Sequence, residues 1–176
     1  FNLKHLDWGG KYYLEHGMMM SPDGLKILSD CDAILLGAIG SPKVPDHIAI
    51  HGLLMPIRQG MEQYINMRPI KYLDGLDSPL KNARPDNIDF MVIRENSEGE
   101  YCGFGSLRNE GTPEEMAVQE SRFSRKGTSR VIRYAFEYAR EHNLNNVISA
   151  TKSNVLHYSM VFWDKIFKEV AASYPD

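Results

Sequence analysis

The chain has 176 residues, with 20 Lys and Arg against 23 Asp and Glu, so its formal net charge is −3. Its 43% of hydrophobic and 24% of charged residues are ordinary globular values and exclude disordered and collagen-like classes. The weak charge argues against nucleic acid or a membrane surface as partner, and no apolar run approaches the roughly 18 residues of a membrane span. The two cysteines, Cys31 and Cys102, form neither a disulfide scaffold nor a paired metal motif, which favours a reducing cytoplasm.

The first part of the chain predicts one strand between helices. A short helix around residues 25–28 leads into the apolar run at 32–38, which is typical of a strand buried on both faces. A loop that contains glycines follows at 37–42. Residues 52–64 predict a helix, with Pro56 early enough that its missing N–H costs little.

The middle of the chain predicts extended structure and a long connection. Residues 65–72 are expected to be extended, because Pro69 disfavours helical backbone in the residue before it. Residues 73–87 carry several Pro, Gly, Asp and Asn and predict a connection, and 88–94 predict a second strong strand. From 95 to 111 the chain is polar and rich in glycine, which favours a β-ribbon or an excursion from the core.

The last part of the chain returns to alternating elements. Residues 116–123 are a further candidate strand, and 146–151 predict another. Apolar residues recur at helical spacing over 129–140 and 160–172. Strands that alternate with helices indicate an α/β fold.

Three arginines lie where an α/β fold binds ligands. Arg58 lies in the helix predicted over 52–64, Arg68 precedes Pro69, and Arg94 ends the second strong strand. Side chains at the carboxyl ends of buried strands reach the ligand crevice, and the planar guanidinium suits carboxylates. Three converging arginines would bind a small di- or tricarboxylate, whereas spacing alone fits three unrelated surface arginines more often.

Two further side chains are candidates for acid–base chemistry. Tyr101 ends the polar stretch that begins at Arg94, and a tyrosine beside a cation can act as a general acid. A solvated turn with one packing aromatic is the plainer explanation of that stretch. Lys152 follows the strand predicted at 146–151, where a partly desolvated lysine can act as a base, although most such lysines are only surface charges.

Five motifs together are far more specific than any of these residues alone. They are A-I-L-L-G-A-I-G at 33–40, V-P-D-H-I at 44–48, I-N-M-R-P at 65–69, R-E-N-S-E-G-E-Y at 94–101 and A-T-K-S-N at 150–154. With them the chain resembles the β-decarboxylating dehydrogenases, a family that includes isocitrate and isopropylmalate dehydrogenases. The resemblance is closest to the tartrate/D-malate dehydrogenase branch, and it runs along essentially the whole chain.

The resemblance implies a role for each candidate residue. Arg58, Arg68 and Arg94 would bind the substrate carboxylates. Tyr101 would protonate the enol left after decarboxylation, and Lys152, reaching across a dimer interface, would take the proton of the C2 hydroxyl. The implied reaction is the NAD-dependent oxidation and decarboxylation of a small 2-hydroxy dicarboxylic acid such as D-malate or tartrate.

The resemblance also implies the cofactors. Gly40, Ser41 and Pro42 would border the nicotinamide end of NAD, and Asn154 would lie near its ribose. The family uses Mg²⁺ or Mn²⁺, and the aspartates that bind the metal are expected beyond Asp176, as is the loop that binds adenine.

The implied architecture is an isopropylmalate dehydrogenase-like two-domain fold, incomplete at both ends. Residues 1–64 would be part of the large nucleotide-binding domain, and 65–176 most of the smaller α/β domain, with an arm at about 99–123 that pairs with a second subunit. We therefore expect a cytoplasmic homodimer, with the 176 residues alone inactive. Two alternatives are a truncated paralogue that only binds or dimerises, and an isopropylmalate dehydrogenase-type activity.

Overall fold

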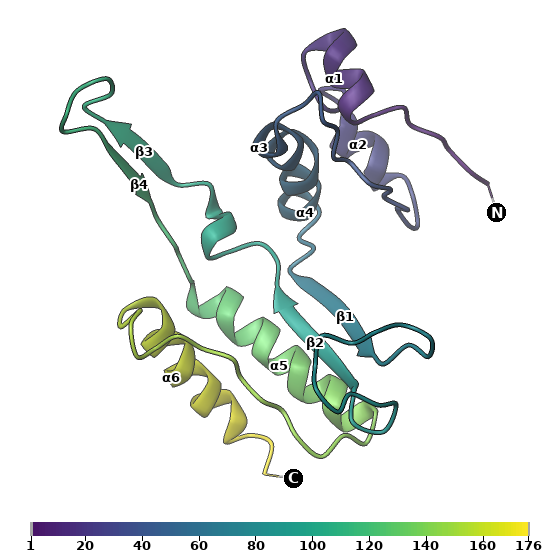
Figure 1. Cartoon of the computed structure of the whole chain (residues 1–176), viewed down its shortest axis with the longest axis vertical. Coiled ribbons are helices and arrows are strands. Elements are labelled where there is room, and N and C mark those ends of the chain that lie inside the picture. The colour runs from purple at the N-terminus through teal and green to yellow at the C-terminus, as the bar shows by residue number, and fades with distance from the viewer. Residues whose placement is uncertain (1, 176) are drawn as a thin grey trace. The chain divides into compact units, whose positions relative to one another are not determined.

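The computed structural model describes residues 2–175 and divides the chain into two compact units (Figure 1). The first unit is Phe1–Gln63 and the second is Tyr64–Asp176. The division falls one residue from the boundary expected from the sequence.

The first unit consists of short helices joined by loops. They are α1 (Gly10–His16), α2 (Gly24–Ser29), α3 (Asp46–Ala49), the π-helix η1 (Ile50–Leu54) and α4 (Met55–Gly60). The helix predicted over 52–64 therefore begins at Asp46 and ends at Gly60. Pro56 explains the π-turn within it: proline has no N–H to donate to the preceding turn, and the Met55 N–H bonds instead to the Ile50 carbonyl, five residues back.

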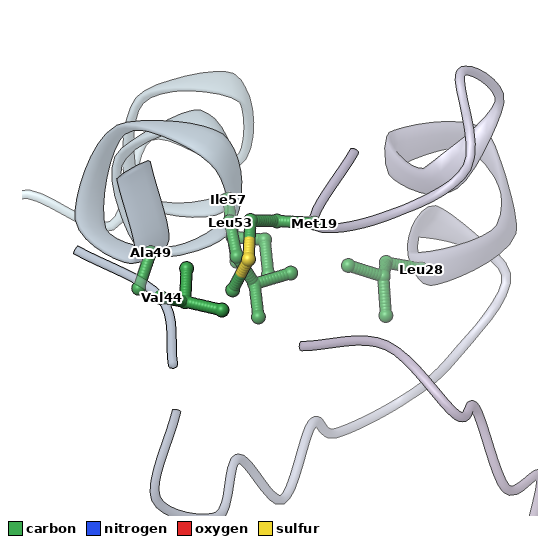
Figure 2. Packing of buried hydrophobic residues seen from close by; sticks show 6 residues of the cluster. All are labelled: Met19, Leu28, Val44, Ala49, Leu53 and Ile57. Carbon is green, nitrogen blue, oxygen red and sulfur yellow. The ribbon is translucent and has the colours of Figure 1, made fainter. Parts of the chain in front are cut away.

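A small hydrophobic core holds this unit together (Figure 2). Its buried members come from all parts of the unit and are Met19, Leu28, Val44, Ala49, Leu53 and Ile57. Gly52 permits a close approach, since a Cβ at this position would lie 2.7 Å from the Met19 Cγ. The helices are thus packed by side chains from loops as well as by each other.

The prediction of a strand at 32–38 is wrong for this structure. Residues 33–40 form neither helix nor strand and pair with no strand among residues 2–175, and Leu35 is fully exposed. A strand needs a neighbour for its N–H and C=O groups and a sheet against which to bury its side chains. The apolar pattern is present, but the sheet that it would join is not among the described residues.

The second unit is built on an antiparallel strand pair, two helices and a hairpin. Strands β1 (Ile65–Lys71) and β2 (Asp89–Glu95) pair antiparallel, with Asn66 opposite Arg94 and Met67 opposite Ile93. Helices α5 (Arg125–Glu141) and α6 (Ser159–Ala171) pack against each other, and α5 contacts β2. These two strands and two helices were all predicted from the sequence, and the structure confirms them. Helix α5 begins four residues earlier than expected.

One face of the strand pair forms the core of the second unit. Ile65 and Ile93 lie on this face and pack against a buried cluster from the two helices. The members of that cluster are Val131, Ile132, Ile166 and Val170. Side chains alternate between the two faces along a strand. Asn66, which follows Ile65, and Arg94, which follows Ile93, therefore point to the opposite face.

The arm predicted at about 99–123 is a hairpin of short strands that extends away from α5 (Figure 1). Strand β3 (Gly105–Arg108) pairs antiparallel with β4 (Met116–Gln119), and the 3₁₀ turn η2 (Glu100–Cys102) precedes them. Gly99 and Arg122 form an isolated bridge that closes its base. Leu107 and Met116 are exposed, so the hairpin presents apolar side chains as well as open strand edges.

The prediction of a strand at 146–151 is also wrong for this structure. Residues 146–152 form neither helix nor strand and pair with no strand among the described residues, and Ile148 is 90% exposed. As at 32–38, a sheet-forming sequence has no adjacent strand within residues 2–175. The described sheets are therefore two separate antiparallel pairs.

Candidate active site

The outer face of the β1–β2 pair carries two arginines. Asn66 and Arg94 are opposite each other in register, and Arg68 lies two residues after Asn66 on the same face. Residues 2–175 offer neither arginine a carboxylate partner. Two guanidinium groups on one face without an acidic partner favour an anionic ligand, and their planar forks suit a carboxylate.

Tyr101 lies against Arg94, as the sequence stretch that joins them allows. An Arg94 Nη donates a hydrogen bond to the Tyr101 hydroxyl, and the guanidinium carbon lies 4.7 Å from the centre of the tyrosine ring. Both side chains are half-buried. The structure therefore brings together a cation and a phenol that can exchange a proton with a ligand bound at this face.

Asn66 holds Arg68 in place from the same face. Its Oδ1 accepts a hydrogen bond from Arg68 Nε at 3.1 Å, and its Nδ2 donates to Asn96 Oδ1 at 3.4 Å. Asn96 is only 4% exposed, so this chain of hydrogen bonds begins in the protein interior. With its Nε engaged, Arg68 keeps its terminal nitrogens for a ligand.

Two glutamates of the R-E-N-S-E-G-E-Y motif order the loop that carries Tyr101. The Glu95 carboxylate accepts hydrogen bonds from the backbone N–H groups of Ser97 and Glu98. The Glu98 carboxylate accepts from the N–H and the hydroxyl of Ser124, the residue that caps α5. Sequence reasoning missed these roles; Ser124 before a helical pattern is a recognisable cap, but Glu98 lies 26 residues away from it.

Lys152 and Asn154 lie in an exposed turn of the second unit. The carbonyl of Lys152 accepts hydrogen bonds from the N–H groups of Val155 and Leu156, which fixes the turn. Both predicted site residues are exposed, and the Lys152 side chain has no hydrogen bond or ion pair with the rest of the described chain. A groove of about 540 Å³ adjoins the turn, lined in part by Val155, Leu156 and Phe162.

The remaining predicted residues lie in the first unit. Arg58 is half-buried on α4. Ser41 forms an isolated bridge with Val44, and its hydroxyl accepts from the Lys43 N–H, so the loop of Gly40, Ser41 and Pro42 leads into a tight turn. A Cβ placed on Gly40 would meet nothing within 4 Å, which leaves its backbone open to a ligand.

Two kinds of feature are absent from residues 2–175. No group of three or more His, Cys, Asp or Glu side chains is placed there to hold a metal ion. None of the helices described is both long and apolar enough to cross a bilayer.

Comparison with known proteins decides the family. The family model described as "Isocitrate/isopropylmalate dehydrogenase" matches residues 1–176. The chain belongs to this family. The match confirms the resemblance drawn from the five motifs and the prediction of an α/β fold of the isopropylmalate dehydrogenase type.

Named relatives and solved structures agree with the family. A probable tartrate dehydrogenase/decarboxylase (TtuC′) of Agrobacterium vitis is 48% identical over 170 residues, covering 97% of this chain and 48% of the relative. The decarboxylating D-malate dehydrogenase of Escherichia coli K12 is 44% identical over 177 residues, covering 99% and 49%. The isocitrate dehydrogenase of Methylococcus capsulatus superposes with a TM-score of 0.73 at 24% identity, covering 96% of this chain and 48% of that one. The chain thus spans about half the length of these relatives.

Proposed function

We propose that the whole protein oxidises and decarboxylates a small 2-hydroxy dicarboxylic acid of the tartrate or D-malate type. The observation that carries the proposal is the pair of arginines on one sheet face, one of them bonded to Tyr101. Two cations without acidic partners suit a doubly charged acid, and a phenol beside them suits proton transfer to the product. Relatives named for tartrate and D-malate match almost the whole chain, which supports this substrate class.

In this mechanism the chain's own residues bind the acid and move two protons. Arg58, Arg68 and Arg94 bind the carboxylates and orient C2. Lys152, from the partner subunit's copy of the exposed turn, accepts the proton of the C2 hydroxyl as hydride leaves C2. The bond to the β-carboxylate then breaks and CO₂ departs, leaving an enolate whose C3 takes the proton of the Tyr101 hydroxyl.

We propose NAD and Mg²⁺ or Mn²⁺ as the cofactors, as family membership implies. When bound, NAD would supply the hydride acceptor. The open backbone at Gly40 beside Ser41 and Pro42 suits its nicotinamide end, and Asn154 would lie near the ribose. Residues 2–175 offer no group of metal ligands, so no metal ligand is assigned to them. Two arms of this kind would pair across a cytoplasmic homodimer, because a lone two-stranded hairpin with exposed Leu107 and Met116 gains stability by packing.

The test is a substrate panel on the whole protein. D-malate and tartrate should each yield NADH and CO₂ with NAD⁺ and Mn²⁺, and EDTA should abolish both products. The 176-residue chain alone should yield neither, since the resemblance places the metal aspartates and the adenine loop outside these residues. Turnover of isocitrate or isopropylmalate, but not of D-malate or tartrate, would overturn the proposed substrate class.

A further inference from the structure

Glu98 joins the Tyr101 loop to the start of helix α5. Its Oε2 accepts a hydrogen bond from the Ser124 N–H at 2.8 Å, and its Oε1 accepts from the Ser124 hydroxyl at 2.6 Å. The same hydroxyl accepts from the Gly127 N–H at 2.9 Å. The carboxylate thus lies at the positive end of a 17-residue helix, where an anion is stabilised.

Gly127 provides the space that this carboxylate occupies. A Cβ at Gly127 would lie 2.3 Å from the Glu98 Cδ and from both carboxylate oxygens. Glycine within a helix costs roughly 0.5–1 kcal/mol relative to alanine. The first turn of α5 therefore has glycine, a poor helix former, at the position where any larger side chain would clash with the Glu98 carboxylate.

The backbone of Glu98 in turn holds Tyr101. The Glu98 carbonyl accepts a hydrogen bond from the Tyr101 N–H at 3.4 Å, while the Glu98 N–H is itself held by Glu95 at 2.7 Å. Gly99, which lies between them, has a φ of 71°, and its added Cβ would lie 2.7 Å from Phe123. The turn that presents Tyr101 to Arg94 is thus fixed on both sides of Glu98.

We propose that Glu98 is a positioning residue for Tyr101, acting through this turn and not by touching the substrate. The inference rests on the proposed function, because it assigns Glu98 to the step in which Tyr101 donates its proton. Geometry of this kind matters for turnover, since a small displacement of a proton donor costs far more in kcat than in binding. If Glu98 served only to stabilise the fold, its loss would instead lower the melting temperature and impair substrate binding and turnover together.

The first test replaces Glu98→Gln in the whole protein. The amide keeps the shape but is neutral, so the hydrogen bonds between this side chain and Ser124 are no longer charge-assisted. We expect kcat for D-malate to fall about 10-fold with KM changed less than about 2-fold, because hydrogen bonds to a charged group are roughly twice as strong as neutral ones. Glu141→Gln is the matched control: it removes the same charge from the exposed far end of α5 and should leave kcat unchanged.

The second test combines Glu98→Gln with Tyr101→Phe. If Glu98 acts through the tyrosine hydroxyl, Glu98→Gln should change kcat less than about 2-fold once that hydroxyl is gone. A loss of about 10-fold in both backgrounds would refute the proposed role of Glu98. If Tyr101→Phe alone leaves kcat unchanged, the proposed function fails instead, so the two failures are distinguishable.

The third test uses Gly127→Ala, which displaces Glu98 without altering it. The clash is with the far end of a flexible side chain, so the carboxylate can swing out, and alanine favours the helix. We expect kcat to fall as in Glu98→Gln while the melting temperature is unchanged or higher. A lower melting temperature with KM and kcat lost together would show a structural role only and would overturn the proposal.

Discussion

Replacing Arg94→Met tests the proposed carboxylate site most directly. Arg94 provides two things at the outer face of β1–β2: a positive charge, which the proposed function assigns to the substrate carboxylate, and a hydrogen bond to the Tyr101 hydroxyl. Methionine has a similar length but neither charge nor donors. Arg94 is half-buried on the face opposite the hydrophobic core, so the substitution leaves the packing of Ile93 intact.

The size of the effect follows from the kind of bond that is lost. A hydrogen bond to a charged group contributes roughly 1.5–3 kcal/mol, and about 1.4 kcal/mol is a factor of ten. We therefore expect kcat/KM for D-malate to fall about 10- to 150-fold. Arg94→Lys keeps the charge but not the fork, so it should recover only part of that loss.

The assay is steady-state NADH formation with D-malate, run at several concentrations of NAD⁺. The KM for D-malate should rise while the KM for NAD⁺ changes less than about 2-fold, because the guanidinium lies on the face proposed to bind the acid and not the dinucleotide. Equal losses for the acid and the dinucleotide would indicate a folding defect. An unchanged kcat/KM for D-malate would refute the assignment of Arg94 to the carboxylate site.

Two further predictions concern the stability of the second unit. Ile166→Ala should lower the free energy of unfolding by about 2–5 kcal/mol in denaturant titrations, because Ile166 is 1% exposed and a cavity would remain; a loss below about 1 kcal/mol would contradict its place in the core. The Tyr174 hydroxyl, followed by Arg140, lowers the pKa of Glu137 below its usual 4.5. This carboxylate therefore stabilises the fold above pH 4.5 and ceases to do so as the pH falls through its lower folded pKa. Glu137→Gln should therefore flatten the acid side of the stability profile measured by denaturant titration, and should change little once the pH lies below that folded pKa.

Local sequence patterns correctly predicted the helices and strands whose packing or pairing partners lie within the described residues. Helices α5 and α6 follow from apolar residues at helical spacing, and β1 and β2 are neighbours in sequence that pair with each other. The runs at 32–38 and 146–151 have equally clear strand patterns, yet neither is a strand. A pattern states only that a segment suits a sheet, whereas a strand also requires a neighbour to bond with.

The candidate site was predictable to the same extent. The sequence makes Arg94 a candidate because it ends a predicted strand, and Tyr101 because it ends the polar stretch that begins there; in the structure the two are hydrogen-bonded to each other. The partnership of Glu98 with Ser124 had no local pattern, since it joins a loop to a helix 26 residues later. Nor does sequence spacing show that Asn66 lies opposite Arg94, because that depends on the register of the two strands.

This register is what ties the candidate site to the core. A slip of one residue between β1 and β2 would turn every side chain of one strand to the other face, so Arg94 would enter the core and Ile93 would be exposed. Ile65 and Ile93 are partly buried against α5 and α6, which opposes such a slip, since full burial of an isoleucine contributes roughly 1.5–3 kcal/mol and partial burial a share of that. Arg68 and Arg94 therefore lie on one face of the strand pair because Ile65 and Ile93 lie on the other. In this way the apolar packing of the second unit determines where its charged side chains lie.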